Sequence, residues 1–309
     1  MDKRVDPRTG GLTAIVLGAA AGGGFPQWNC RCPICRLAWD GDPRVKPRTQ
    51  ASLAVSADGR QWVLLNASPD LRAQIQAVPA LQPIAMPRGS PIAGVVLTGA
   101  EVDQVGGLLT LRERGELTLF GTSETLAAVD ENPIFGVLAG DIVRRHPVSL
   151  GEPFALPNGL HAEVFAVPGK VALYLERGEP ELAAQDGVNV GIEIRNGGSR
   201  LVYVPGAAAI AADLLERLGR ANVLLFDATL FHDDEMIASG TGKKTGRRMG
   251  HMPLDGADGT LQRLAGLTAR RILTHINNTN PILVEGSPER RKVEAAGFEI
   301  AEDGMEIVL

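Results

Sequence analysis

Short apolar runs alternate with segments of helical pattern along this chain, and that alternation limits its fold more than any other feature of the sequence. In the first half we expect strands at residues 12–17, 50–56, 61–66, 92–97 and 117–121, and helices at 68–77, 103–114 and 123–131. In the second half we expect strands at 160–167, 191–195, 200–203, 221–226 and 271–274, and helices at 208–218 and 257–268. Strands that alternate with helices predict an α/β protein built from two similar halves.

The length of 309 residues is close to the size at which one hydrophobic core stops growing. Length by itself allows either one large domain or two similar halves, and we expect a single domain over residues 1–309. Three segments, at 82–91, 176–189 and 238–250, lack periodicity and are rich in Gly, Pro, Lys and Glu. We interpret them as loops or lids rather than linkers between domains. The sequence leaves open whether two copies form a homodimer.

The net charge and the N-terminal segment argue against several classes of protein. A net charge of −5 gives no electrostatic reason to bind DNA, RNA or an anionic membrane. The apolar run at 12–21 follows a short basic start and could be taken for a signal peptide. Acidic residues interrupt that start, however, and the run leads directly into a glycine-rich loop, which favours a buried strand. No stretch reaches the ~20 apolar residues of a membrane span, so we expect a cytoplasmic protein.

The chain has three cysteines, Cys30, Cys32 and Cys35, and they lie within six residues of one another. An odd count in one tight cluster argues against a disulfide framework and favours a metal site in a reducing compartment. Three thiolates suit Zn²⁺, which needs one further ligand to close a tetrahedral, structural shell. The alternative is three buried, unpaired cysteines. A redox pair is disfavoured, because the strand–helix–strand setting of such a motif is missing here.

Polar residues follow several of the predicted strands. Asp103 and Asp227 come after buried strands, His275 ends another, and His251 follows a glycine turn. Asp103 taken alone could simply cap a helix, and an isolated histidine is more often structural. Because ligand sites in α/β sheets gather at the carboxyl ends of strands, we expect these four side chains to share one site. Imidazoles with carboxylates suit Zn²⁺ or Fe²⁺.

These motifs resemble the family of pyrroloquinoline quinone (PQQ) synthesis protein B, a branch of the metallo-β-lactamase superfamily. The similar stretches include LGAAAGGGFPQWNCRCPIC at 17–35, PRTQASLAVS at 47–56, TGRRMGHM at 245–252 and HINNTNP at 275–281. The resemblance spans nearly the whole chain. It implies an αββα sandwich, in which two mixed sheets face each other with helices outside and metals at one edge.

The chain departs from the wider superfamily at its first metal motif, His-x-His-x-Asp-His. With Asp103 as the motif's aspartate, Gly99, Glu101 and Gln104 stand where histidines are expected. The resemblance therefore disfavours a two-zinc hydrolase. Members of the family usually keep the last histidine, so Gln104 is a particular feature of this chain. It would act either as a weak metal ligand or as a hydrogen-bond donor to the metal ligands.

The cysteine cluster resembles the structural zinc loop of a related phosphodiesterase branch. In that branch the fourth ligand is a histidine three residues after the last catalytic histidine. The equivalent position here is Asn278, an unusual zinc ligand.

The resemblance implies an iron-dependent oxygenase that hydroxylates the tyrosine-derived ring of a crosslinked Glu-Tyr precursor. Asp103, His251 and His275 would hold Fe²⁺, and Asp227 would orient a ligand or accept a proton. The first alternative is a carrier that helps move PQQ or its precursor towards the periplasm. The second is a hydrolase, which the missing histidines disfavour.

A basic segment is the expected contact for the substrate. The precursor is polyanionic, and Lys244, Arg247 and Arg248 offer cations that pair with carboxylates. The alternative interpretation of these three residues is an exposed basic loop without a ligand.

Overall fold

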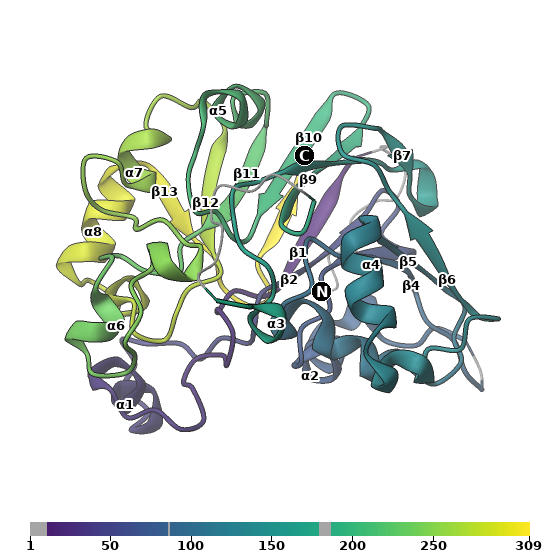
Figure 1. Cartoon of the computed structure of the whole chain (residues 1–309), viewed down its shortest axis with the longest axis horizontal. Helices are drawn as coiled ribbons and strands as arrows, with labels where there is room; N and C mark the ends of the chain where they lie inside the picture. The colour runs from purple at the N-terminus through teal and green to yellow at the C-terminus, as the bar shows by residue number, and fades with distance from the viewer. Residues whose placement is uncertain (1–10, 86, 179–186) are drawn as a thin grey trace, which may run out of the picture.

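Two sheets face each other in the computed structural model, with helices on the outer surface of each (Figure 1). The structure describes residues 11–85, 87–178 and 187–309, and within them each sheet has seven strands. The first sheet runs, in spatial order, β14 (Glu306–Val308), β1 (Thr13–Gly18), β2 (Ser52–Ser56), β3 (Trp62–Leu65), β4 (Ile92–Val96), β5 (Leu117–Gly121) and β6 (Val143–Pro147). The second runs β13 (Phe298–Ile300), β12 (Arg270–Thr274), β11 (Val223–Asp227), β10 (Ser199–Val204), β9 (Val190–Asn196), β8 (His161–Ala166) and β7 (Phe154–Ala155).

Both sheets are mixed. Strands β3 to β6 pair in parallel in the first sheet, as do β10 to β13 in the second, and the remaining neighbours are antiparallel. The inner faces meet in one core that includes Leu53, Val63, Ile192 and Leu225, all with no exposed surface. This is the αββα sandwich that the resemblance implied, so the predicted fold is confirmed.

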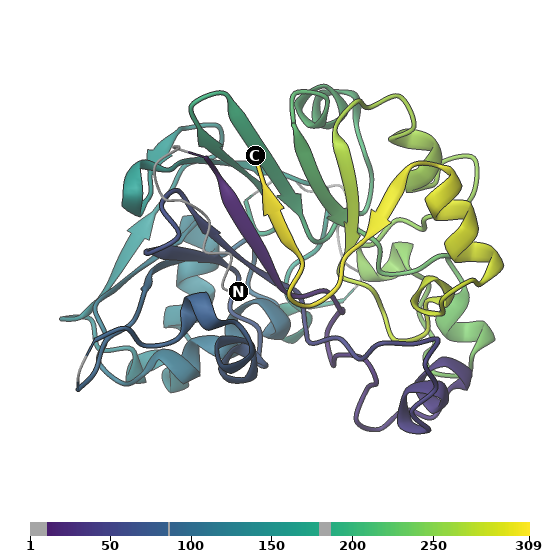
Figure 2. The same ribbon diagram turned by 180° about the vertical axis from the view of Figure 1, so that it is seen from behind.

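Helices cover the outer faces, as the two opposite views show (Figures 1 and 2). The α-helices are α1 (Pro33–Trp39), α2 (Leu71–Ala77), α3 (Val102–Val105), α4 (Ser123–Asp130), α5 (Ala212–Leu218), α6 (Glu235–Ala238), α7 (Thr260–Arg263) and α8 (Pro288–Ala295). Short 3₁₀ turns add η1 (Pro79–Leu81), η2 (Gly106–Leu111), η3 (Pro133–Val137), η4 (Pro157–Gly159), η5 (Leu173–Leu175), η6 (Arg247–Met249) and η7 (Pro281–Leu283). Leu71 and Leu126 of α2 and α4 pack on the first sheet, and Leu214 and Val293 of α5 and α8 on the second. Within the described chain, no helix has the length and apolar character that crossing a membrane requires.

The helix predicted at 103–114 is wrong in length, because α3 ends at Val105 and a 3₁₀ turn, η2, follows. Gly107 explains the change: its N–H donates to Ala67 O at 2.8 Å, and a Cβ there would lie 2.1 Å from Ser68 O. This contact draws the chain out of regular helical geometry. The helices predicted at 208–218 and 257–268 are likewise shorter, as α5 and α7. Most of the predicted loop at 176–189 lies outside the described residues.

Candidate metal centre

The parallel strands β11 and β12 end side by side and carry two of the predicted site residues. Asp227 is the last residue of β11 and pairs in register with Thr274 of β12, directly before His275. His275 has φ 56°, a left-handed conformation that a non-glycine residue adopts rarely. His275 is also buried, at a bend that directly follows β12. Its imidazole points towards the first half of the molecule.

Asp103 comes from that first half, on α3, and meets His275 across the sandwich. The distance from His275 Nε2 to Asp103 Oδ2 is 2.9 Å, although the residues are 172 positions apart in sequence. Two ligands at right angles on one cation, each with a bond of ~2.1 Å, lie about 3 Å apart. The observed spacing therefore fits adjacent ligands of a single metal ion.

His251 completes a group of donors at the same place. Its ring stacks on that of His275, with centroids 5.2 Å apart and an interplanar angle of 21°. Its Nδ1 lies 2.7 Å from Asp227 Oδ2. Single ligand atoms of Asp227, His251 and His275 all lie within 4.8 Å of one another. The structure thus brings together all four polar residues singled out from the sequence, Asp103, Asp227, His251 and His275.

Asp227 differs from Asp103 in its surroundings. Asp227 has no exposed surface, and its two oxygens accept hydrogen bonds from Ala207 N–H (3.1 Å), Thr229 N–H (3.0 Å) and the Thr229 hydroxyl (2.7 Å), in addition to the His251 contact. Asp103, His251 and His275 line a cavity of about 790 Å³, whereas Asp227 lies behind them. Asp227 therefore lies behind the cavity wall, with a carboxylate oxygen close enough to His251 and His275 to share a metal ion with them.

Thr229 lies within hydrogen-bond distance of Asp227 and both imidazoles, and the sequence analysis did not single it out. The one available signal was its place two residues after Asp227. Its Oγ1 lies 2.8 Å from His275 Nδ1 and 3.0 Å from His251 Nδ1. When the Thr229 hydroxyl donates its one proton to Asp227 Oδ1, its lone pairs can accept from an imidazole that carries its proton on Nδ1. This arrangement leaves Nε2 of a neutral ring free to act as a metal ligand.

The protonation of the centre follows from burial and close charges. Burial alone would raise the pKa of Asp227, but the charge of His251 and hydrogen bonds to both imidazoles outweigh it and hold the pKa below the ordinary range. Burial alone would lower the pKa of His275. Its hydrogen bonds to Asp103 and Asp227 overcome that effect and raise the pKa to about 10. The pair of carboxylates thus favours positive charge at this position, whether a proton or a metal cation supplies it.

Gln104 and Glu101 stand where the superfamily motif has histidines, and both make other contacts here. Gln104 Oε1 accepts from Glu101 N–H at 3.1 Å, and its Nε2 donates to Thr98 Oγ1 at 3.4 Å. A Cβ on Gly99 would lie 2.6 Å from the same Oε1. The Glu101 carboxylate accepts from Lys170 Nζ at 2.7 Å. Gln104 lines the cavity, yet its amide is bound to the start of α3.

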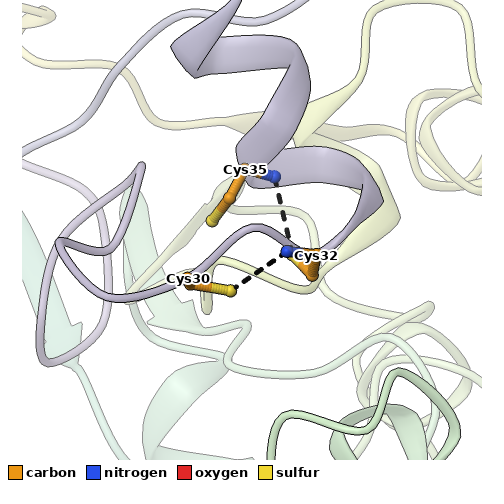
Figure 3. Close-up of side chains that lie close together, drawn as sticks. All are labelled: Cys30, Cys32 and Cys35. Atoms are coloured by element: carbon orange, nitrogen blue, oxygen red, sulfur yellow. Dashed lines mark hydrogen bonds between the residues drawn. The ribbon is translucent and has the colours of Figure 1, made fainter.

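The cysteine cluster forms a second group of donors (Figure 3). The sulfur atoms of Cys30, Cys32 and Cys35 lie within 4.8 Å of one another, and Cys35 at the start of α1 has no exposed surface. Asn278 Nδ2 lies 3.2 Å from the sulfurs of Cys30 and Cys35, so its side-chain amide occupies the predicted fourth corner. Burial raises the pKa of Cys35 to about 12. A soft cation bound to the three thiols would replace their protons.

The structure separates the three residues of the predicted basic segment. Lys244 lines the cavity, together with Lys170, which the sequence analysis did not single out. Arg248 does not line the cavity but lies 3.8 Å from Glu176, a neighbour of Lys244. Arg247 is exposed and outside the cavity lining, so the structure does not place its side chain at the site. Lys170 ends the stretch VPGK at 167–170, which directly follows β8, and no pattern in the sequence analysis pointed to it.

Comparison with known proteins gives consistent results for sequence and structure. A family model described as a beta-lactamase superfamily domain matches residues 61–276. Coenzyme PQQ synthesis protein B of Methylobacterium nodulans is 54% identical over 299 residues, which cover 96% of this chain and 100% of the relative. The protein of that name from Rhizobium meliloti is 52% identical over 303 residues, covering 98% and 99%.

Comparison with solved structures leads to the same family. The structure of Zn(2+)-bound PqqB from Methylobacterium extorquens has a TM-score of 0.95 and 51% identity, and covers 96% of this chain and 100% of that chain. A diphosphatase of the PhnP family has a TM-score of 0.69 at 20% identity, covering 97% of both chains, which is a likeness of fold alone. With sequence identity above 50% along nearly its whole length and the same fold, the chain belongs to the coenzyme PQQ synthesis protein B family of the beta-lactamase superfamily.

Proposed function

We propose that this chain acts in PQQ biosynthesis as an iron-dependent oxygenase that hydroxylates the tyrosine-derived ring of a Glu-Tyr precursor. The observation that carries the proposal is the 2.9 Å approach of Asp103 to His275 at the wall of a cavity of about 790 Å³. The names of the relatives support the biosynthetic role. The donor set, one open carboxylate with two imidazoles, supports a mononuclear centre rather than a two-metal hydrolytic one.

In this proposal the residues of the site have different roles. Asp103, His251 and His275 would hold Fe²⁺, which supplies open coordination positions for O₂ and substrate when it is bound. Asp227 and Thr229 would keep the two imidazoles in the orientation that ligation requires. Gln104 would shape the wall beside the ligands, since its amide already bonds the start of α3.

The cysteine cluster would hold a structural Zn²⁺. Cys30, Cys32 and Cys35 supply three thiolates, and Asn278 would supply the fourth ligand through its amide oxygen if the amide is turned about its last bond. The zinc named for the relative from Methylobacterium extorquens supports a zinc site in this chain.

Compartment and domain organisation belong to the same proposal. Three free thiols fit a reducing, cytoplasmic compartment. Because the cavity wall takes Asp103 from one half of the chain and His275 from the other, we expect residues 1–309 to act as one domain.

Oxygen consumption on the precursor tests the oxygenase. Apo-protein reloaded with Fe²⁺ and supplied with a two-electron reductant should consume O₂, place one oxygen atom on the ring of the precursor and release the other as water, whereas protein reloaded with Zn²⁺ should not. Asp103→Ala should lower the rate at least 10³-fold, while His161→Ala, at the exposed start of β8, should leave it unchanged. Zinc-supported cleavage of esters without oxygen uptake would instead identify a hydrolase.

A carrier is the second candidate, and one observation favours it. Gln104 is bound to backbone and side chain around α3, so this centre has one metal ligand fewer than the usual motif provides. A site with weakened metal affinity and lysines in its wall could still bind a polyanion. Tight PQQ binding without any turnover of precursor would favour this candidate over the oxygenase.

A further inference from the structure

The side-chain amide of Asn189 is fixed in the wall of the cavity that holds the metal centre. Its Nδ2 donates to Val167 O at 3.2 Å and to Gly206 O at 3.1 Å. Carbonyl oxygens only accept hydrogen bonds, so the amide nitrogen must face them, and both of its protons are used. Asn189 directly precedes β9, and its backbone carbonyl accepts from Val167 N–H at 3.1 Å, which holds the main chain as well.

The side-chain oxygen of Asn189, Oδ1, is the polar end left for a ligand. No residue that the structure describes donates a hydrogen bond to it. Asn189, Gly206 and His251 all line the cavity. A Cβ on Gly206 would lie 3.8 Å from Asn189 Oδ1 and 3.4 Å from His251 Cε1, so the glycine leaves space between the oxygen and the imidazole. An acceptor of fixed direction therefore faces open space beside the metal centre.

Gly169 is matched to this arrangement. A Cβ at that position would lie 2.3 Å from Asn189 Nδ2 and 2.7 Å from Asn189 Cγ, closer than non-bonded atoms approach. Any larger residue at 169 would push the amide away from its two carbonyl partners. The orientation of Asn189 thus requires the glycine beside it.

We propose that Asn189 Oδ1 accepts a hydrogen bond from a ring hydroxyl of the ligand and so positions the ring at the metal centre. The inference rests on the proposed function for its ligand class, a hydroxylated aromatic ring. The acceptor is a neutral amide, which suits a neutral hydroxyl, whereas a cationic amine bonds more strongly to a charged acceptor. The oxygens of a quinone can only accept, so they gain no hydrogen bond from Oδ1. The site therefore holds a hydroxyl-bearing ring more tightly than the same ring oxidised to the quinone.

Calorimetric titration of PQQ and of its reduced form, PQQH₂, in which both quinone oxygens are hydroxyls, tests the proposal. The full chain is loaded with Zn²⁺ and kept without oxygen, so that neither form is oxidised or reduced during the measurement. Asn189→Ala removes the acceptor, and the ratio of the two affinities, reduced over oxidised, should fall at least 5-fold relative to wild type. Any preference that the metal itself has for one form is present in both proteins and cancels in this comparison.

Gly206→Ala tests the position of the ring and keeps the proposal falsifiable if Asn189→Ala does not fold. The added methyl group fills the space between Asn189 Oδ1 and the His251 ring, so affinity for PQQH₂ should fall at least 5-fold. Gly198→Ala is the matched control in the exposed turn between β9 and β10, where a Cβ meets no atom within 4 Å. It should change the affinity less than 2-fold.

Two outcomes would overturn the inference. An unchanged ratio in Asn189→Ala would show that the residue is only structural or that it binds a donor common to both forms, such as the pyrrole N–H. Equal affinity for PQQH₂ in wild type and Gly206→Ala would show that the ring does not lie beside His251. Neither measurement involves turnover, so failure here is separate from failure of the oxygenase.

Discussion

The two candidate cation centres differ in how they are built, although only residues 276 and 277 separate His275 from Asn278. In the centre at Asp103 and His275, the donors come from distant parts of the chain, and the His251 side chain is 19% exposed to a large cavity. In the cysteine cluster, three donors come from one short loop, and the sulfur of Cys35 is buried. The first centre can admit a ligand and the second cannot.

This difference assigns the two centres different roles. Closed thiolate sites contribute to folding, whereas sites with an open position carry chemistry. Disruption of the cysteine cluster should therefore reduce stability first, and disruption of the open centre should reduce ligand or metal binding first. The following variants test that distinction, from the largest expected effect to the smallest.

Cys35→Ser should give the largest change in stability. The loop at 30–39 has little core of its own, so loss of a thiolate should lower the unfolding free energy by about 4 kcal/mol or more, as expected for a lost structural metal. Urea unfolding with metal analysis measures the effect. Asp103→Ala is the comparison at the open centre and should lower stability less, by about 1–3 kcal/mol, because it removes one partner of the largely buried pair with His275. Equal losses of unfolding free energy in Cys35→Ser and Asp103→Ala would contradict the proposal that one centre is structural and the other binds ligands.

Thr229→Val should weaken metal binding at the open centre about 10–100-fold, because both imidazoles lose the oxygen that orients them. Competition titration with Fe²⁺ or Co²⁺ measures this affinity. Thr229→Ser keeps the hydroxyl and should remain within about 3-fold of wild type. If valine and serine behave alike, the hydroxyl does not orient the rings.

Glu235→Gln should change how stability depends on pH. Glu235 accepts from Thr279 Oγ1 at 2.6 Å and from Phe231 N–H at 2.8 Å, and so ties α6 to the loop that carries Asn278. Burial raises the pKa of Glu235 to about 7. The folded state therefore binds this proton more strongly than the unfolded state, and wild-type stability should fall as pH rises from about 5 to 8, by roughly 1–3 kcal/mol.

The glutamine variant should lack that part of the pH dependence, because its amide does not ionise. Urea unfolding at pH 5 and pH 8 compares the two proteins, with Glu116→Gln as the exposed control. If the unfolding free energy of wild type changes no more between pH 5 and pH 8 than that of Glu235→Gln, the Glu235 carboxyl does not titrate in this pH range.

Gln104→His should have the smallest effect on the fold and a selective effect on the open centre. The amide that accepts from Glu101 N–H is lost, at a cost of about 1 kcal/mol. We expect a higher iron-to-protein ratio, because the imidazole restores a ligand of the superfamily motif. Equal iron content in wild type and variant would show that residue 104 lies outside the coordination shell.

The α/β class and the donors at strand ends were predictable because periodic burial and turn chemistry are local properties of the chain. The strand β6 was missed, since Arg144, Arg145 and His146 lack the apolar pattern of a buried strand. The helix α8 was also missed, although Ser287 and Pro288 signal its start. In both cases, tertiary contacts stabilise a segment whose own pattern is weak.

The sequence by itself determined the candidate site residues: three clustered cysteines, and two carboxylates and two imidazoles that follow strands or a glycine turn. Only the tertiary structure decided how they act. It brought Asp103 against His275, set Asp227 behind the cavity wall, bound the Gln104 amide to Glu101 N–H and placed Glu176 beside Lys170. The physical reason is that ligation and ion pairing depend on distances of a few ångströms between atoms far apart in sequence, which the packing of the two sheets sets and no local pattern encodes.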